Sequence, residues 1–163
     1  CARCPVAEGC KAFALGQQSE FPGRKPRRVL PTRQTTFAIA CSPQGELYLQ
    51  RRPGSGLWGG LLCFPEVEDS DAARRFCEEQ LACDVHEICA LPPLRHSFSH
   101  YHLEISPALL TLARPPTLVK ERDDLRAWPA GEPPAVGLAA PVKRLWQDAV
   151  ASIRTQDTGE EQA

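Results

Sequence analysis

Two short stretches of the chain are dominated by apolar and β-forming residues. They read TTFAIAC (35–41) and ELYLQRR (46–52), and SPQG between them supplies the proline and glycine of a tight turn. Two such runs separated by a turn are typical of a β-hairpin. We therefore predict strands from Thr36 to Cys41 and from Glu46 to Arg51.

Two later segments carry apolar residues at helical spacing. In DAARRFCEEQLA, Ala72 and Phe76 lie one turn apart, which predicts a helix from Asp71 to Cys83 with Ser70 or Asp71 as its N-cap. In APVKRLWQDAVASIR (140–154) an apolar stripe predicts a second helix. The residues of that stripe are Val142, Leu145, Trp146, Ala149, Val150 and Ile153.

Partial alternation of apolar and polar residues in VHEICAL (85–91) and HLEISPALLTL (102–112) predicts further strands. Together with the helices, these strands predict an α/β fold with a mixed β-sheet. The last ten residues, 154–163, are mostly polar, so we expect a disordered tail.

Length and composition favour one compact domain. The chain has 163 residues and a hydrophobic content of 42%, enough to form a core without a metal or disulfide. It has no run of 18 or more apolar residues and no secretion signal at its start. We therefore expect a cytoplasmic monomer that does not enter the membrane.

Positive charge is concentrated at the start of the chain. Residues 1–33 carry seven Lys and Arg against two Glu, a net charge of +5, which leaves −6 for the remainder. Residues 11–33 are also rich in Gly, Pro and Gln, so they are interpreted as a basic connector that ends at a domain boundary near residues 32–34. Such an arm suits nucleic acid, and a solvated linker explains the charge equally well.

The cysteines fall into two groups. Cys1, Cys4 and Cys10 form C-x2-C-x5-C, a clustering that core packing does not require. Zinc is disfavoured there, because a closed zinc site needs four ligands and a second pair is absent. The other five lie in apolar runs, where buried free thiols explain them better than disulfides do. These five are Cys41, Cys63, Cys77, Cys83 and Cys89.

A long, specific spacing of functional residue types begins at Gly60. Its members are Gly60, Glu66, Arg74, Phe76, Glu78 and Glu79. The pattern resembles the Nudix box, in which glutamates projecting from a helix hold divalent cations at a pyrophosphate. Two residues depart from that pattern: Arg75 stands where the family has a Glu, and Leu81 where it has a Gly.

The resemblance to the Nudix box implies a Nudix-like α/β/α sandwich, and the departures predict that hydrolysis has lapsed. The Glu replaced by Arg75 would be a metal ligand, so no magnesium is expected at this degenerate box. Arg75 can instead pair with Glu79 one turn further along the helix. Glu78 and Glu79 are then surface residues or braces for a loop.

Several motifs in one order resemble the C-terminal part of MutY-type adenine DNA glycosylases. They are CARCPVAEGC, LPTRQTTF, RRPGSGLWGGL, LLCFPE, HSFSHYHL and GLAAPVKRLW. The resemblance implies that Cys1, Cys4 and Cys10 are the last three ligands of a 4Fe-4S cluster whose fourth ligand precedes residue 1. It also implies a bacterial, nucleoid-associated parent enzyme that removes adenine mispaired with 8-oxoguanine or guanine in double-stranded DNA.

By this resemblance, Phe98, Ser99 and His100 form the loop that senses 8-oxoguanine. Oxidation turns N7 of guanine from an acceptor into a donor and adds a carbonyl at C8, and the Ser99 hydroxyl can meet either group. Without the family, the same residues fit an ordinary turn into a strand. A metal site at His96, His100 and His102 is disfavoured, because strand alternation puts only two of them on one face.

Two further segments have candidate roles at DNA. Trp58, which lies between glycines, suits the core and a DNA contact equally well, and Leu57 shares this ambiguity. Four connector residues are expected to contact phosphates. They are Arg24, Lys25, Arg27 and Arg28.

The sequence thus divides into the end of a cluster motif (1–10), the connector (11–33), a Nudix-like recognition domain (34–153) and a tail (154–163). We expect the chain to recognise the damaged base and, without the catalytic groups of the parent glycosylase, to be inactive alone. Two alternatives stay open. One is an active nucleotide pyrophosphohydrolase, and the other is a domain that docks proteins through the acidic surface from Glu66 to Asp71.

Overall fold

The computed structural model describes residues 1, 3–21, 23, 29–117 and 123–160. Contacts divide the chain into two units, Cys1–Leu30 and Pro31–Ala163. This division falls close to the boundary predicted near residues 32–34. The start of the chain and the sheet domain are therefore separate structural units.

The first unit contains only short helical turns among its described residues. Ala7–Gly9 (η1) and Gln18–Glu20 (η2) are 3-10 turns, and Lys11–Ala14 (α1) is one turn of α-helix. None of these three elements has a buried residue. The segment predicted as a connector therefore includes local turns but no apolar core around them.

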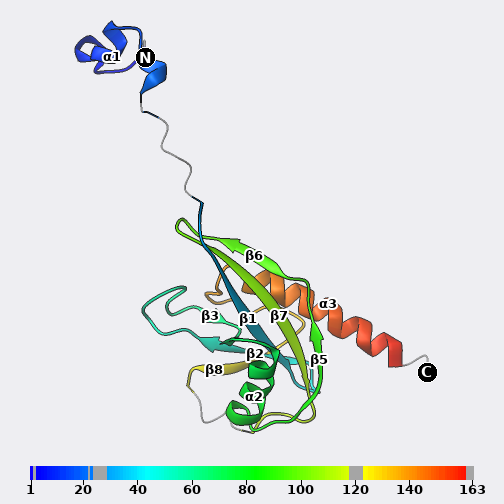
Figure 1. Cartoon of the computed structure of the whole chain (residues 1–163). Coiled ribbons are helices and arrows are strands. Elements are labelled where there is room, and N and C mark those ends of the chain that lie inside the picture. Colours follow the sequence, from blue (N-terminus) through cyan, green and yellow to red (C-terminus); the bar gives the residue numbers. More distant parts are fainter. Residues whose placement is uncertain (2, 22, 24–28, 118–122, 161–163) are drawn as a thin grey trace. The chain divides into compact units, whose positions relative to one another are not determined.

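The second unit is built on one mixed β-sheet (Figure 1). Its strands are β1 (Thr32–Cys41), β2 (Glu46–Arg51), β3 (Leu62–Cys63), β4 (Glu66–Val67), β5 (Val85–Ala90), β6 (Leu94–Ser97), β7 (His102–Leu112) and β8 (Leu125–Pro129). The main path runs β3–β2–β1–β7–β5, with β4 added to β1, β6 to β7 and β8 to β2. The long strands β1 and β7 are parallel and lie at its centre.

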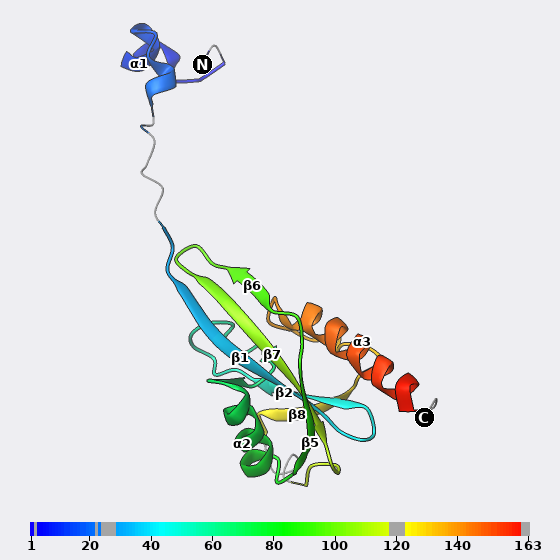
Figure 2. The same cartoon turned by 45° about the vertical axis from the view of Figure 1, so that its right-hand side comes forward.

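Alternation along β1 gives the sheet two apolar faces. Phe37 and Ile39 belong to one buried cluster, and Ala38 between them belongs to the other. Helix α3 (Val142–Glu160) packs into the first cluster and helix α2 (Ser70–Gln80) into the second. The two helices thus cover opposite faces (Figure 1, Figure 2), which confirms the predicted α/β/α sandwich.

Helix α2 starts and ends slightly earlier than predicted. The side chain of Asp69 caps it by accepting a hydrogen bond from the backbone N–H of Ala72 at 2.7 Å. The predicted caps, Ser70 and Asp71, are therefore wrong. The helix ends before Ala82, whose φ of 49° lies in the left-handed region and does not continue a right-handed helix.

Helix α3 extends to Glu160, so residues 154–160 are helical where the sequence predicted a disordered tail. Thr155 shows how a polar residue is accommodated. Its Oγ1 donates to the carbonyls of Ala151 at 3.3 Å and Ser152 at 2.7 Å, so the helix itself satisfies the hydroxyl. Polar composition does not end this helix, and residues 161–163 lie outside the described part.

All eight cysteines are free, which confirms the prediction of free thiols for the five that lie in apolar runs. Cys41, Cys63, Cys77 and Cys83 are buried. The prediction that Cys89 is also buried is wrong, because this residue is half-exposed on β5, the last strand of the main sheet path. Among the described residues, no helix is long and apolar enough to cross a membrane.

Candidate nucleic-acid interface

The predicted sensor residues lie at the tip of the hairpin that joins β6 to β7. Ser97 pairs with His102 across the two strands, and the Ser97 hydroxyl lies 2.9 Å from Nδ1 of that histidine. The N–H of Phe98 donates to the carbonyl of Tyr101 at 2.9 Å, which closes the turn. The N–H of His102 donates to the carbonyl of Pro31, so the hairpin is tied to the start of β1.

Phe98, Ser99 and His100 are consecutive residues at the tip of this hairpin. Ser99 and His100 are exposed, and Phe98 is partly buried. Ser99 Oγ lies 3.3 Å from Nδ1 of His100, and which of the two groups donates depends on the histidine tautomer. The tip therefore offers solvent a hydroxyl and an imidazole beside an anchored aromatic ring.

An aromatic cluster surrounds the tip of the hairpin. The Phe98 ring centroid lies 4.8 Å from that of Tyr101, 4.6 Å from that of His96 and 5.4 Å from that of Trp58. The guanidinium carbon of Arg33, on β1, lies 4.8 Å from the centroid of Tyr101, which is a cation–π contact. The tip is thus supported by rings of the hairpin itself and by two segments distant in sequence, the loop with Trp58 and β1 with Arg33.

The sequence left open whether Trp58 lies in the core or contacts DNA, and the structure shows which residues of the fold it contacts. Its indole is partly buried and packs against the core, and it also touches the rings of His96 (5.6 Å between centroids) and Phe98. Trp58 therefore belongs both to the core and to the support of the hairpin. The sequence carries a signal for this role only in the glycines around Trp58, which indicate a tight loop.

Four of the predicted DNA contacts, Arg24, Lys25, Arg27 and Arg28, lie outside the described residues. Arg33 is the basic residue of the first 33 that the structure places at the hairpin. It is exposed at its β1 position next to Leu103 of β7. A positive charge from the described residues therefore lies beside the candidate sensor.

Cys1, Cys4 and Cys10 lie along successive turns at the start of the chain. The Cys4 N–H donates to the Cys1 carbonyl, and Cys1 and Cys4 are exposed while Cys10 is partly so. Within the described part of the chain, no three His, Cys, Asp or Glu side chains are grouped as ligands for a metal ion. A 4Fe-4S site takes four thiolates, and Cys1, Cys4 and Cys10 supply three, so these residues alone do not complete one.

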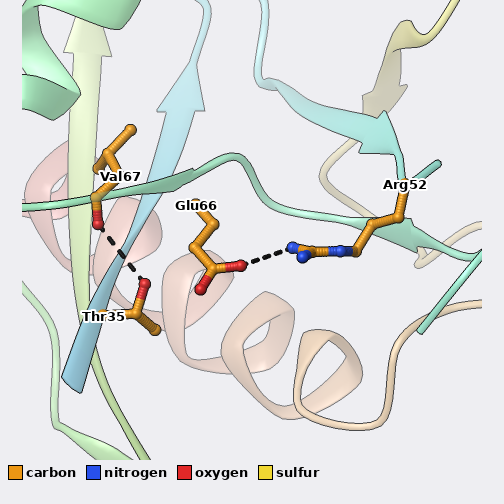
Figure 3. Close-up of polar contacts among 4 residues, drawn as sticks. All are labelled: Thr35, Arg52, Glu66 and Val67. Atoms are coloured by element: carbon orange, nitrogen blue, oxygen red, sulfur yellow. Dashed lines mark hydrogen bonds and ion pairs between the residues drawn. The ribbon is translucent and has the colours of Figure 1, made fainter. Parts of the chain in front are cut away.

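Several side chains of the degenerate box make contacts within the fold. Arg52 donates to Glu66 Oε2 at 2.7 Å, and this ion pair engages the first glutamate of the box (Figure 3). The hydroxyl of Thr35 donates to the carbonyl of Val67 at 3.5 Å, a weak bond that joins β4 to β1. The guanidinium of Arg74 donates to the carbonyl of Val85 at 3.2 Å, so it joins α2 to β5.

The remaining box residues face solvent or the core. Arg75, Glu78 and Glu79 are exposed, which confirms the surface position predicted for the two glutamates. The predicted pair of Arg75 with Glu79 is not among the ion pairs of the described residues, because two long exposed side chains gain little from holding one geometry. Leu81 is fully buried, so its departure from the family's glycine adds an apolar side chain to the core.

A cavity of about 280 Å³ lies beside the Arg52–Glu66 pair, lined also by Gln50, Cys63 and Phe64. Burial works to lower the pKa of Arg52, but the hydrogen bond and charge of Glu66 outweigh it and raise that pKa. Burial raises the pKa of the Cys63 thiol to about 12. The cavity therefore holds a neutral thiol and an arginine whose charge is already matched by Glu66.

The α/β/α sandwich and the spacing from Gly60 to Glu79 define the class of this domain. A family model described as the NUDIX domain matches residues 36–148, and the chain belongs to that family. The box residues found in the sequence thus belong to a family pattern, and in this chain Glu66 and Arg74 make contacts within the fold.

Comparison with individual proteins narrows the relationship. The chain is 23% identical over 148 residues to a protein named adenine DNA glycosylase from Buchnera aphidicola subsp. Acyrthosiphon pisum, a match that covers 91% of this chain and 42% of that relative. The chain therefore spans about two fifths of that relative's length. The resemblance to the C-terminal part of MutY-type adenine DNA glycosylases is confirmed by this match together with the solved domain described next.

Two solved structures share the fold. The C-terminal domain of mouse MUTYH, solved in complex with human PCNA, superposes with a TM-score of 0.55 at 17% identity, covering 76% of this chain and 89% of that one. A MutT NUDIX hydrolase from Burkholderia pseudomallei superposes with a TM-score of 0.56 at 17% identity, covering 72% and 97%. A domain from a glycosylase and a hydrolase thus match the same sandwich, so the fold alone does not choose between their activities.

Proposed function

We propose that this chain is the damaged-base recognition domain of an adenine DNA glycosylase. It binds double-stranded DNA that contains 8-oxoguanine:adenine or guanine:adenine mispairs. The observation that carries the proposal is the exposed Ser99 hydroxyl at the tip of a braced hairpin, between Phe98 and His100. Similarity to a named adenine DNA glycosylase over 91% of the chain supports it.

The chemistry of the tip suits a base with a reversed hydrogen-bond pattern. 8-Oxoguanine has an N–H donor at position 7 and a carbonyl acceptor at position 8, where guanine has an acceptor at N7 and no carbonyl. A hydroxyl both donates and accepts, so Ser99 can accept from N7–H or donate to O8. His100 is placed beside it to reach a base edge or a phosphate, and Phe98 anchors the turn.

Positive charge gives the proposed domain its general affinity for DNA. Arg33 lies at the hairpin, and the connector adds Arg24, Lys25, Arg27 and Arg28 in the chain just before it. Each phosphate contact steepens the dependence of the logarithm of affinity on the logarithm of salt concentration by about 0.9. In the proposed division of labour, charge holds the duplex and the hairpin reads the base.

Cleavage belongs to the rest of the parent enzyme in this proposal. The parent flips adenine out of the duplex and cleaves its glycosidic bond with groups that this chain does not contain, in a bacterial, nucleoid-associated setting. A 4Fe-4S cluster, if Cys1, Cys4 and Cys10 contribute to one, requires a fourth thiolate from the parent. The chain alone is therefore expected to leave adenine in place.

The side chains of the box disfavour a pyrophosphohydrolase. Glu66 is engaged by Arg52, and Arg75 places a positive charge where a metal ligand is needed. We propose that no magnesium binds there. The expected measurement is that addition of Mg2+ releases neither phosphate nor pyrophosphate from oxidised or ordinary nucleoside triphosphates.

A binding experiment tests the proposal. Two duplexes, identical except for 8-oxoguanine:adenine or guanine:adenine, are titrated into the 163-residue chain and into its Ser99→Ala variant at low salt. Loss of one hydrogen bond to the base lowers the preference for the oxidised duplex by about three- to tenfold. Ser106→Ala is the matched control, because Ser106 is an exposed serine of β7, the strand that follows the hairpin tip, and lies away from that tip.

The proposal predicts a preference in the wild-type chain, its reduction in Ser99→Ala and an unchanged value in Ser106→Ala. Equal reduction in both serine variants would remove Ser99 from the sensor. Equal binding of the two duplexes by the wild-type chain would show that it contributes charge alone and does not read the base.

A further inference from the structure

The loop that carries Trp58 is held in one conformation by its own backbone. The N–H of Arg52 donates to the carbonyl of Leu61 at 2.9 Å, and the N–H of Gly60 donates to the carbonyls of Arg52 and Pro53 at 3.2 and 3.1 Å. The N–H of Leu61 donates to the carbonyl of Trp58 at 3.0 Å. The loop is therefore a closed, hydrogen-bonded unit at the end of β2.

Two backbone features fix the direction of the indole within this loop. Trp58 has a φ of 54°, in a left-handed region that residues with a side chain rarely adopt. Gly59 passes so close to Gly54 that a Cβ on Gly59 would lie 2.5 Å from the Gly54 carbonyl oxygen. Trp58 therefore has an unfavourable backbone conformation, and position 59 requires glycine. In this conformation the indole lies against the hairpin.

The indole contacts the ring that anchors the sensor. The Trp58 centroid lies 5.4 Å from that of Phe98, whose opposite neighbour is Tyr101 at 4.8 Å, and Tyr101 in turn contacts Arg33. Phe98 directly precedes Ser99 in the chain, so an anchored Phe98 ring restrains the backbone from which the Ser99 side chain projects. Without the indole, Phe98 would lose one of the rings that anchor it, and its remaining contacts would be those within the hairpin and with the core.

We propose that Trp58 is a positioning residue for base recognition: the rigid loop 52–61 presses its indole against Phe98 and thereby fixes the Ser99 hydroxyl for reading the oxidised base. The ring contacts support the positioning of Phe98 by Trp58, and the effect on base recognition rests on the proposed function. By this inference, a segment outside the Phe98–His100 turn contributes to selectivity. Trp58 itself makes no contact with the base in this scheme.

The test uses variants of the 163-residue chain that separate the loop from the core. Trp58→Ala removes the indole, Trp58→Phe keeps an aromatic ring, and Gly59→Ala displaces the loop by forcing a Cβ against Gly54. Gly54→Ala is the matched control, because a Cβ there meets nothing within 4 Å. All four are compared with the wild-type chain.

Hydrogen exchange of the Phe98 amide in the free protein reports the position of the hairpin, because this N–H donates to Tyr101. We expect faster exchange in Trp58→Ala and Gly59→Ala, partial recovery in Trp58→Phe and no change in Gly54→Ala. The preference for the 8-oxoguanine duplex over the guanine duplex is expected to fall about two- to tenfold in the first two variants. Affinity for the guanine duplex and the exchange of β1 amides stay unchanged.

Unchanged exchange at Phe98 in Trp58→Ala would overturn the positioning role, and equal loss of affinity for both duplexes would then indicate direct contact of the indole with DNA. Faster exchange throughout the sheet would overturn it too, since the indole would then serve global stability alone. If the wild-type chain does not distinguish the duplexes, the proposed function fails. In that case the rate of hydrogen exchange at the Phe98 amide alone decides whether Trp58 holds the hairpin in position.

Discussion

The two faces of the sheet are packed in different ways. The face under α3 is filled with large side chains, including Phe37, Phe64 and Trp146. The face under α2 is filled largely with small ones, including Ala38, Ala73 and Cys77. The helix that carries the box remnant therefore sits close over small residues, and the hairpin and the Trp58 loop pack with the bulky face.

Polar side chains of the box and of the hairpin also differ in their contacts. On the box side, Arg52, Glu66 and Arg74 are committed to partners within the fold. At the hairpin, Ser99 and His100 are exposed to solvent; the Ser99 hydroxyl lies near Nδ1 of His100, whose ring also contacts Phe98 and Tyr101. The polar groups on the box side thus bond to other parts of the fold, whereas those at the tip of the hairpin face solvent.

The largest expected effect concerns the bulky face. Trp146 is buried, stacks with Phe64 at 6.2 Å between centroids and donates its indole N–H to the carbonyl of Ala130 at 3.1 Å. We expect Trp146→Ala to lower the free energy of unfolding by about 3–5 kcal/mol, measured by urea denaturation. Cys77→Ala on the other face should cost about 1 kcal/mol. Similar losses in the two variants would contradict the difference between the faces.

A smaller effect is expected where the box has become structural. Arg52→Ala leaves Glu66 without its partner in a partly buried site, and we expect unfolding free energy to fall by about 1–2 kcal/mol. The double variant with Glu66→Gln should recover part of the loss, because the unpaired carboxylate is gone. No loss in Arg52→Ala, read from the same urea curves, would mean that the pair is a surface contact of little value.

The smallest effect is a dependence of stability on pH that comes from the buried thiols. Burial raises the pKa of Cys63 and of Cys77 from 9.0 to about 12. The unfolded chain then loses these protons first, so stability is complete below pH 9 and is lost as the pH rises from 9 through 12. At pH 9 each thiol should cost about 0.4 kcal/mol relative to pH 7, measured by thermal or urea unfolding.

Alanine variants check the source of this pH dependence. Cys63→Ala and Cys77→Ala should each flatten the fall in stability above pH 9. Burial also raises the pKa of Tyr48 to about 12, from 10.0, so a residual slope is expected at higher pH. An unchanged slope near pH 9 in both cysteine variants would show that other groups cause it.

Much of the fold could be predicted from local patterns, because the apolar residues of β1, β2 and α3 are buried as their spacing indicates. The pattern of apolar and polar residues did not predict the start of β1. Its first residues, Thr32, Arg33 and Gln34, are polar and exposed, and backbone pairing with β7 holds them in the strand. The pattern also missed β6 and β8, which are short and do not alternate clearly. Long-range strand pairing leaves no signal in such residues.

The candidate site was predictable only in part. Family resemblance pointed to Phe98 to His100, whereas the residues alone favoured an ordinary turn, and the structure shows a turn there. The contact of Trp58 with Phe98 could not be found from either source, because it depends on how two separate loops meet in space. Spacing along the chain carries no information on such a meeting.

The bond from His102 to Pro31 has a mechanical consequence. The chain runs from the connector into β1, which is held to the parallel strand β7 over ten residue pairs beginning with Thr32 and His102. A pull on the connector along β1 would load that ladder in shear, so many bonds share the force. The bond between His102 and Pro31 would bear this force first, and it adjoins the β6–β7 hairpin. Tension in the connector would therefore reach the tip of this hairpin before any other part of the sheet.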